Sequence, residues 1–207
     1  VVDIKGKERL EGITLAQVDS HGKPISGTEE EYSCDTLLLS VGLIPENEIS
    51  RGMGVDMNPV TSGPKVNESL ETNIEGVFAC GNVLHVHDLV DFVSQEASMA
   101  GNCAAAFVKT GRTEETAEVL VKCGTGVRYT VPAKIRPAYM EEKLPVRFRV
   151  GAVYQKASIV VRSGDTVLLR KKRPVMAPGE METVYIKKDA LLSDERPEEI
   201  TISIEEE

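Results

Sequence analysis

Two apolar segments that each lead into a glycine corner constrain the fold of this chain more than any other feature. The first follows Cys34 and turns at Gly42-Leu-Ile-Pro45, and the second runs from Thr72 through Gly76 to Gly81-Asn82. A nearly continuous apolar run bounded by turn residues is typical of a strand covered on both faces. We therefore expect core strands over residues 36–41 and 76–79.

The segments around these two strands predict a meander, a crossing and a helix. Short apolar runs separated by turns between residues 13 and 42 indicate antiparallel strands that feed the core strand. Glycines and prolines between residues 46 and 64 mark an exposed crossing between lobes. Apolar residues at three- and four-residue steps predict a helix over 89–108, with Asp88 as its N-cap and Gly111 as its C-cap. Gly101 in that helix suggests the close approach of another backbone.

After Glu118 the pattern changes to short strands separated by turns, with nothing helical between them. Six strands are expected, over residues 127–131, 146–150, 158–162, 166–170, 183–186 and 200–204. They predict a small antiparallel sandwich that is large enough to fold alone. Its predicted core consists of Val146, Phe148, Val150, Ile159, Val161, Val167, Leu169, Val184 and Ile186.

Composition limits the classes of partner. The chain has 207 residues, 41% of them hydrophobic, and 33 acidic against 24 basic residues give a net charge of −9. This charge disfavours nucleic acid and anionic membrane surfaces. No apolar run is long enough to span a bilayer, so we expect a cytoplasmic enzyme. The four cysteines form no Cys-x-x-Cys pair or zinc spacing, and we expect them to be reduced and mostly buried.

The two corners, in this order and about thirty residues apart, resemble the closing half of the pyridine nucleotide-linked FAD oxidoreductases, a superfamily that includes thioredoxin reductases. The resemblance covers roughly residues 10–110. The phrase Gly81-Asn-Val-Leu-His-Val-His-Asp88 is similar to a bacterial group related to opine and sarcosine oxidase subunits, often accompanying a glycerol-3-phosphate dehydrogenase. The implied fold is α/β, a partial two-dinucleotide-binding flavoprotein lobe, followed by the all-β domain. The implied domains are 1–45, the last meander of the NAD(P) domain; 46–117, the end of the FAD domain; and 118–207.

The resemblance also implies cofactor-binding residues. Gly81 admits the flavin, and Asn82 replaces the family's acid at the ribityl hydroxyls, where its amide can both accept and donate hydrogen bonds. Ser94, Gln95 and Glu96 correspond to residues at the start of a helix whose backbone groups meet the pyrimidine edge of the flavin. About five extra residues separate the corner from the helix here. A plain strand-ending turn and an amphipathic core helix remain the alternatives for these two elements.

The extra residues hold His85 and His87, for which several roles are open. Histidines at i and i+2 point to opposite sides of a strand, and no third ligand is evident, so no metal is expected. A lid over the flavin that exchanges protons is one hypothesis, and two exposed loop histidines are the simplest one. Other features have plain structural interpretations: Cys80 as a buried strand cysteine, Glu46 and Asn47 as a hinge, and residues 170–173 as a solvated hairpin.

The implied activity is hydride exchange between NAD(P)H and FAD, with electrons passed to a partner subunit or small acceptor. The chain holds no Gly-x-Gly-x-x-Gly phosphate-binding loop. We therefore expect it to be a C-terminal fragment of the parent enzyme, without bound FAD or NAD(P) and inactive alone, with homo- or hetero-oligomers left open. The rival hypothesis is a non-catalytic assembly module that docks a partner through its β-domain. Catalytic residues, substrate and the choice between NADH and NADPH cannot be read from these residues.

Overall fold

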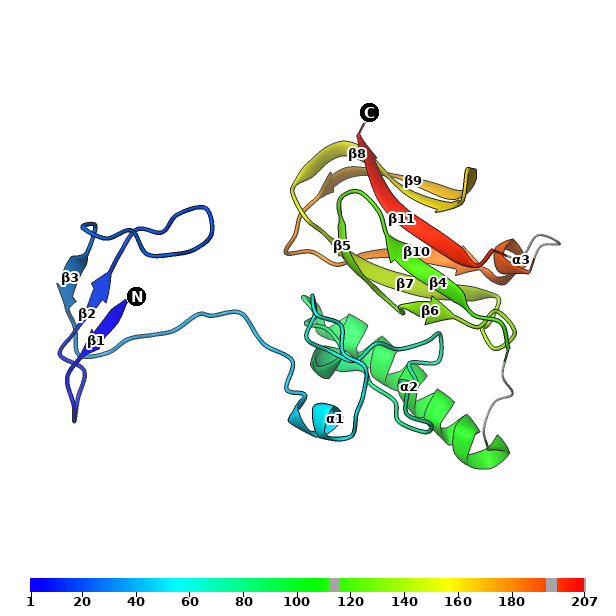
Figure 1. Cartoon of the computed structure of the whole chain (residues 1–207), viewed down its shortest axis with the longest axis horizontal. Helices are drawn as coiled ribbons and strands as arrows, with labels where there is room; N and C mark the ends of the chain where they lie inside the picture. Colours follow the sequence, from blue (N-terminus) through cyan, green and yellow to red (C-terminus); the bar gives the residue numbers. More distant parts are fainter. Residues whose placement is uncertain (112–115, 193–196, 207) are drawn as a thin grey trace. The chain divides into compact units, whose positions relative to one another are not determined.

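The computed structural model describes residues 1–111, 116–192 and 197–206, and it divides into two compact units. The first unit spans Val1–Gly42 and the second Leu43–Glu207. Figure 1 labels their helices and strands.

The first unit is a three-stranded antiparallel sheet in the order β1-β2-β3. The strands are β1 (Asp3–Lys5), β2 (Gly12–Leu15) and β3 (Glu30–Ser33). Ile13 in the central strand pairs with Ile4 on one side and Tyr32 on the other. The expected antiparallel meander is therefore confirmed, although its strands are short.

The expected core strand over residues 36–41 is wrong. The described chain has no regular secondary structure between Cys34 and Asn47, and Leu38, Leu39 and Val41 are 89%, 67% and 75% exposed. A strand of this apolar composition is stable only where neighbouring strands satisfy its backbone groups and both faces are covered. Nothing among the described residues provides that cover.

The second unit begins with loops and short helices. The helix α1 (Glu48–Gly52) is followed by a turn at residues 57–64, and the 3-10 helix η1 (Gly81–Val83) lies at the second glycine corner. A Cβ at Gly63 would lie 1.8 Å from the carbonyl oxygen of Leu84, so only glycine lets the two backbones approach this closely. The expected strand over 76–79 is reduced to an isolated bridge between Phe78 and Glu71.

The long helix α2 (Val90–Thr110) confirms the helix expected at this position. Gly111 ends it with φ +77° and donates its N–H to the Phe107 carbonyl at 2.8 Å, as expected of a C-terminal cap. The start differs, because Leu89 is the N-cap and no side chain caps the helix. Asp88 instead accepts a hydrogen bond from the Met181 N–H at 3.2 Å. Gly101 is exposed, and a Cβ there would meet no atom of another element within 4 Å, so the predicted close approach is wrong.

The strand-rich region contains two sheets. One has the order β10-β7-β5 and the other β6-β4-β11-β8-β9. Every described pairing is antiparallel except that of β11 with β4, which is parallel. The strands are β4 (Val119–Cys123), β5 (Val127–Val131), β6 (Lys134–Ile135), β7 (Lys143–Val150), β8 (Tyr154–Ser163), β9 (Thr166–Met176), β10 (Glu182–Lys187) and β11 (Glu199–Glu206). All six expected strands are present; β4, β6 and the one-turn helix α3 (Lys188–Leu191) were not expected.

One hydrophobic core joins the two sheets face to face. Seven of the nine predicted core residues belong to it, and Leu169 packs against its edge. Val167 is 43% exposed, so its predicted burial is wrong. It lies near the start of β9, three residues after Gly164 of the hairpin turn, and β9 is an edge strand with a neighbouring strand on one side only.

A second, smaller core links these sheets to the segment before them. Tyr129 and Val131 of β5 pack with Val66, Leu70 and Leu84, together with Ala79 and Ala100. Helix α2 runs along this side of the sheets in Figure 1. Residues 43–111 and the strand region therefore form one compact unit.

Candidate functional site

The Gly81–Asn82 corner lies beside the first turns of α2. Gly81 has φ +68°, a conformation that favours glycine, and a Cβ there would lie 3.4 Å from the Val93 side chain. The Asn82 side chain is exposed, and its Oδ1 accepts a hydrogen bond from the His87 N–H at 3.1 Å. Its amide Nδ2 has no hydrogen bond to any described residue, so a donor faces solvent at this corner.

The free amides of α2 lie earlier in the chain than the sequence suggested. The first N–H groups of a helix have no partner inside it. Here these groups belong to Val90 and Asp91, whereas the N–H groups of residues 94–96 bond to carbonyls one turn back. The backbone N–H groups of Ser94, Gln95 and Glu96 are therefore not available to a flavin, because α2 starts at Val90 and these residues lie in its second turn. Flavin binding by these residues stays a prediction.

Glu96 is the best-connected residue at the corner. It is fully buried, and its Oε2 accepts the Gly81 N–H at 2.7 Å. Its Oε1 lies 3.0 Å from His85 Nε2, and its Oε2 lies 3.4 Å from His87 Nε2. Burial alone would raise the pKa of Glu96, but the interactions with the two adjacent histidines outweigh it and lower the pKa to about 2. The side chain is therefore a carboxylate at neutral pH.

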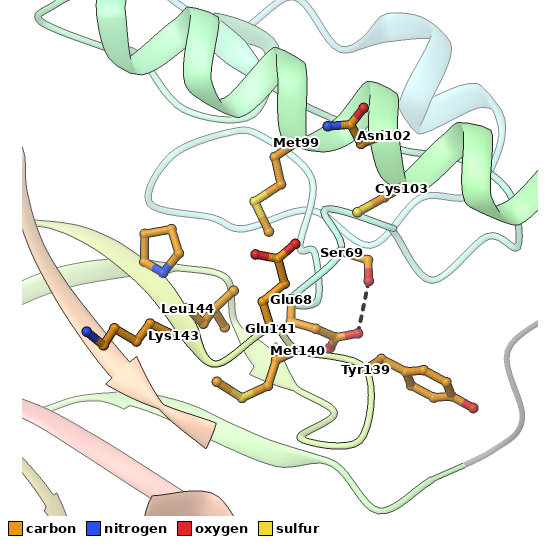
Figure 2. Close-up of a pocket in the computed structure, with 11 residues that line it drawn as sticks. Glu68, Ser69, Met99, Asn102, Cys103, Tyr139, Met140, Glu141, Lys143 and Leu144 are labelled. Carbon is orange, nitrogen blue, oxygen red and sulfur yellow. Dashed lines mark hydrogen bonds between the residues drawn. The ribbon is translucent and has the colours of Figure 1, made fainter. Parts of the chain in front are cut away.

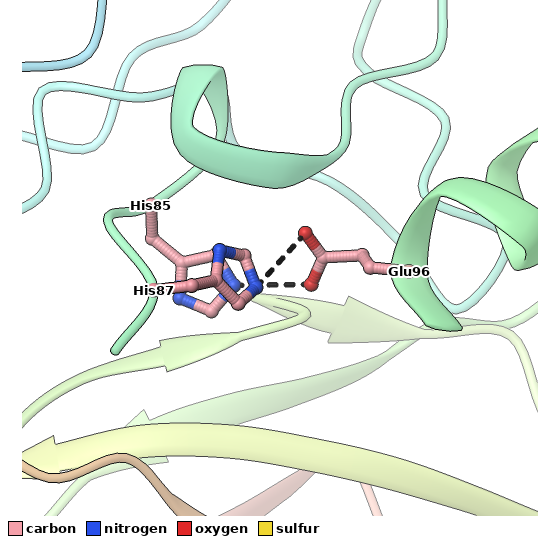
Figure 3. Close-up of side chains that lie close together, drawn as sticks. All are labelled: His85, His87 and Glu96. Atoms are coloured by element: carbon pink, nitrogen blue, oxygen red, sulfur yellow. Dashed lines mark hydrogen bonds and ion pairs between the residues drawn. The ribbon is translucent and has the colours of Figure 1, made fainter. Parts of the chain in front are cut away.

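The two histidines are buried and adjacent (Figure 3). Both side chains are 0% exposed, and their ring centroids are 4.4 Å apart in an edge-to-face arrangement. Both the exposed-loop interpretation and the flavin-lid hypothesis required accessible rings and are wrong. The two rings do not point to opposite sides, as they would in a strand, because residues 84–89 form an irregular loop. Burial lowers the pKa of His85, so its imidazole is neutral.

The sheet supplies three further residues that the sequence analysis missed. Arg147 Nη1 lies 3.5 Å from Glu96 Oε1, and Tyr129 Oη lies 3.4 Å from His85 Nδ1. Arg149 donates to the Val86 carbonyl at 3.0 Å and lies 3.6 Å from Asp88. A signal was present in the sequence, since Arg147 and Arg149 alternate with apolar residues on a strand predicted to be buried. Charges on the second face of such a strand indicate that another element covers it.

Ser94 and Gln95 lie on the exposed side of α2. Gln95 Oε1 is 3.4 Å from Arg147 Nη2, which is a long hydrogen bond. The structure therefore brings Glu96, Gln95 and Arg147 together near the corner and leaves Ser94 apart. Asn47, expected to be structural, is buried and donates its amide to the carbonyls of Ser62 and Val83.

A cavity of about 390 Å³ lies between α2 and the sheets, away from the corner. Figure 2 shows it between Met99 and Cys103 of the helix and Tyr139–Leu144 of the strand region. The Glu68 and Glu141 side chains line it. Burial and these carboxylates raise the pKa of the Cys103 thiol, so the cavity holds no activated nucleophile.

All four cysteines are free, and within the described ranges the chain holds no disulfide. Cys80 is half-buried next to the corner. Its pKa is raised mainly by burial and to a smaller extent by the negative charge of Glu96. Among the described residues no helix is long and apolar enough to cross a membrane.

Comparison with known proteins identifies the family. Residues 2–106 match the model of the pyridine nucleotide-disulphide oxidoreductase family, and the chain belongs to it. The family is one of FAD- and NAD(P)-dependent oxidoreductases. No solved structure matches the chain.

Several curated relatives are similar over part of their length. A ferredoxin–NADP reductase of Leuconostoc mesenteroides is 33% identical over 100 residues, covering 46% of this chain and 28% of that protein. One from Picrophilus torridus is 29% identical over 86 residues, covering 42% and 24%. A dihydrolipoyl dehydrogenase of Trypanosoma brucei brucei is 30% identical over 132 residues, covering 60% and 26%. The aligned segments thus span about a quarter of each relative.

The residues at the corner fit a flavin in part. The exposed Asn82 amide and the free N–H groups of Val90 and Asp91 are donors of the kind that ribityl hydroxyls and the flavin O2 edge require. The Gly81 N–H and the Glu96 carboxylate do not fit, because they bond to each other inside the protein.

Proposed function

We propose that this chain forms part of an FAD-dependent oxidoreductase that exchanges hydride between NAD(P)H and FAD. Electrons would then pass to a small acceptor or a partner subunit. The observation that carries the proposal is the exposed Asn82 amide, held beside the free N-terminus of α2 inside the segment that matches the family. The first unit, Val1–Gly42, would contribute to the NAD(P) lobe.

In this proposal Asn82 and the N-terminus of α2 bind different parts of FAD. When bound, FAD supplies the redox chemistry by taking up a hydride from NAD(P)H. The Asn82 amide would donate to a ribityl hydroxyl while its Oδ1 stays fixed by the His87 N–H at 3.1 Å. The helix N-terminus carries a partial positive charge, which stabilises electron density at the nearby ring edge. Glu96 would act as a positioning residue, because its bond to the Gly81 N–H fixes the corner against α2.

The pyrophosphate of FAD needs donors that this chain does not provide. A Gly-x-Gly-x-x-Gly turn is absent from the sequence. We propose that residues outside these 207, in a longer polypeptide or a second subunit, complete the site. The purified chain should then be colourless, and a polypeptide that joins it to such a loop should be yellow.

The test of the site is a pair of substitutions at Asn82 in that complete, flavin-binding protein. Asn82→Leu leaves the ribityl hydroxyl of bound FAD without its hydrogen bond from the Asn82 amide. A buried polar group without a partner lowers the FAD affinity by about 1–3 kcal/mol. Asn82→Asp keeps an acceptor for the His87 N–H and restores the family's acid. We expect weaker FAD retention in the first variant and retention at least equal to wild type in the second.

Equilibrium dialysis measures the FAD affinity of the two variants. Unchanged flavin affinity in Asn82→Leu would contradict the assignment of the ribityl contact. Stoichiometric FAD on the isolated 207-residue chain would contradict the proposal that the site is completed elsewhere.

A further inference from the structure

Three metal-ligating side chains meet in the interior of the second unit. His85 and His87 come from the turn before α2, and Glu96 comes from the second turn of the helix. One ligand atom from each of the three lies within 4.8 Å of the other two. No third ligand on a separate element is evident in the sequence, and in the structure Glu96 of α2 is that ligand.

The separations suit a small transition-metal ion. Two ligands bound tetrahedrally to Zn²⁺ at about 2.0–2.1 Å lie roughly 3.3 Å apart. The carboxylate oxygens of Glu96 lie 3.0 Å from His85 Nε2 and 3.4 Å from His87 Nε2. The two contacts use different carboxylate oxygens, and the three ligand atoms lie within 4.8 Å of one another, so binding an ion requires the rings and the carboxylate to move closer together.

His87 provides an independent observation. Its side chain is 0% exposed, yet neither ring nitrogen makes a hydrogen bond in the structure. The contact with Glu96 lacks hydrogen-bond geometry, although Figure 3 shows the ring edge directed at the carboxylate. Burying a polar group without a partner costs about 1–3 kcal/mol. A metal ion at Nε2 removes that cost.

The surroundings complete a second layer around the ligands. Tyr129 Oη, 3.4 Å from His85 Nδ1, can accept a hydrogen bond from the N–H of this nitrogen once Nε2 binds an ion. The Gly81 N–H holds the Glu96 carboxylate in place at 2.7 Å. Arg147, 3.5 Å from the other carboxylate oxygen, balances the Glu96 charge when no ion is present. A metal-free charge network is therefore the competing arrangement.

We propose that His85, His87 and Glu96 bind a divalent transition-metal ion of the zinc type. The set of two imidazoles and one carboxylate is one that Zn²⁺ accepts, with a water molecule as the fourth ligand. Because the ligands are buried, the ion has a structural role: it ties the turn that follows the Gly81–Asn82 corner to α2. This role does not depend on flavin binding.

The test uses the purified 207-residue chain after treatment with chelator and dialysis, slightly above neutral pH. Co²⁺ is the spectroscopic probe and Zn²⁺ the competitor. We expect about one equivalent of Co²⁺ to bind, with visible ligand-field absorption that Zn²⁺ abolishes. Zn²⁺ should also raise the midpoint of thermal unfolding, since an ion that binds only the folded state stabilises it.

Matched substitutions locate the site. The chain has three histidines, so His21→Ala, in the exposed turn of the first unit, is the control for His87→Ala. His87→Ala should lose the cobalt spectrum and weaken binding by about tenfold or more, while His21→Ala should leave both unchanged. Glu96→Gln keeps an acceptor for the Gly81 N–H and serves as a second variant if His87→Ala does not fold. Its binding should weaken similarly.

Two results would overturn the proposal. One is the absence of stoichiometric Co²⁺ or Zn²⁺ binding to the folded wild-type chain. The other is binding that His87→Ala and Glu96→Gln leave intact. Because no flavin is present, either result leaves the proposed oxidoreductase function standing.

Discussion

Arg136 and Glu68 form the ion pair that most directly joins the strand region to the preceding loops. The guanidinium Nη2 lies 2.9 Å from Glu68 Oε1, and the Arg136 N–H donates to Oε2 at 2.7 Å. Glu68 is 2% exposed. Removing one partner of a buried pair leaves an uncompensated charge, which costs far more than the pair contributes.

We therefore expect Arg136→Ala to lower the free energy of unfolding by about 3–5 kcal/mol, measured by urea denaturation. The control is Lys134→Ala, which removes the same charge from a half-exposed pair with Glu118 and should cost at most about 1 kcal/mol. Equal effects of the two substitutions would show that the buried pair has no special role.

Cys103 gives a prediction for thiol reactivity. Burial raises its pKa, so a smaller fraction is thiolate at any given pH than in a free cysteine. We expect slow labelling by iodoacetamide at neutral pH. The labelling rate should rise only at a pH above the ordinary pKa of a thiol. Mass spectrometry of the modified peptide measures this, with the unfolded chain as the reference. Rapid labelling of the folded chain at pH near 7 would show that the thiol is activated.

At the scale of elements, the strand region has its own core, but residues from the preceding segment cover one face of its β5 strand. Every fully buried residue of the main core lies between Val119 and Ile204. Tyr129 and Val131, in contrast, belong to the smaller core, whose other buried residues come from the preceding segment. Arg147 contacts Glu96 and Gln95 of that segment, and Arg149 donates to Val86 there as well as to Pro178 of the strand region.

We expect the segment from Glu118 to Glu207, expressed alone, to unfold cooperatively but at lower stability than the same strands within the chain. Exposing Tyr129 and Val131 costs about 2 kcal/mol each, the usual value for uncovering a large apolar side chain. Calorimetry and amide dispersion in NMR spectra measure the outcome. A disordered spectrum would mean that the strands need residues 43–111, and that the proposed boundary near 118 is wrong.

At the scale of the whole molecule, the chain is two compact units with an apolar, irregular segment before and after their boundary. Leu38, Leu39, Leu43 and Ile44 are between 66% and 89% exposed. Proteases cut where several residues can adopt an extended conformation without unfolding a core.

Limited proteolysis with chymotrypsin should therefore cut within residues 38–44 first and release a stable fragment of the second unit. Mass spectrometry of the early products identifies the site. Primary cleavage inside the second unit instead would contradict the division at Gly42.

The sequence by itself determined the elements that depend on local signals. The helix over residues 90–110 follows from its 3.6-residue apolar period and from Gly111, and the six expected strands follow from alternation between turns. The apolar face of each strand fixed most of the sandwich core in the same way. The sequence also placed the chain in its family through two glycine corners.

Only the tertiary structure decided what surrounds the candidate site. Glu96 contacts His85 and His87 because α2 starts at Val90, which places the Glu96 side chain on the buried face of the helix. Arg147, which contacts Glu96, lies on a strand 51 residues later in the chain. The apolar run at 36–41 failed as a strand for the converse reason, since a strand needs partners that its own residues do not encode. Contacts between distant segments depend on packing, and no local pattern specifies them.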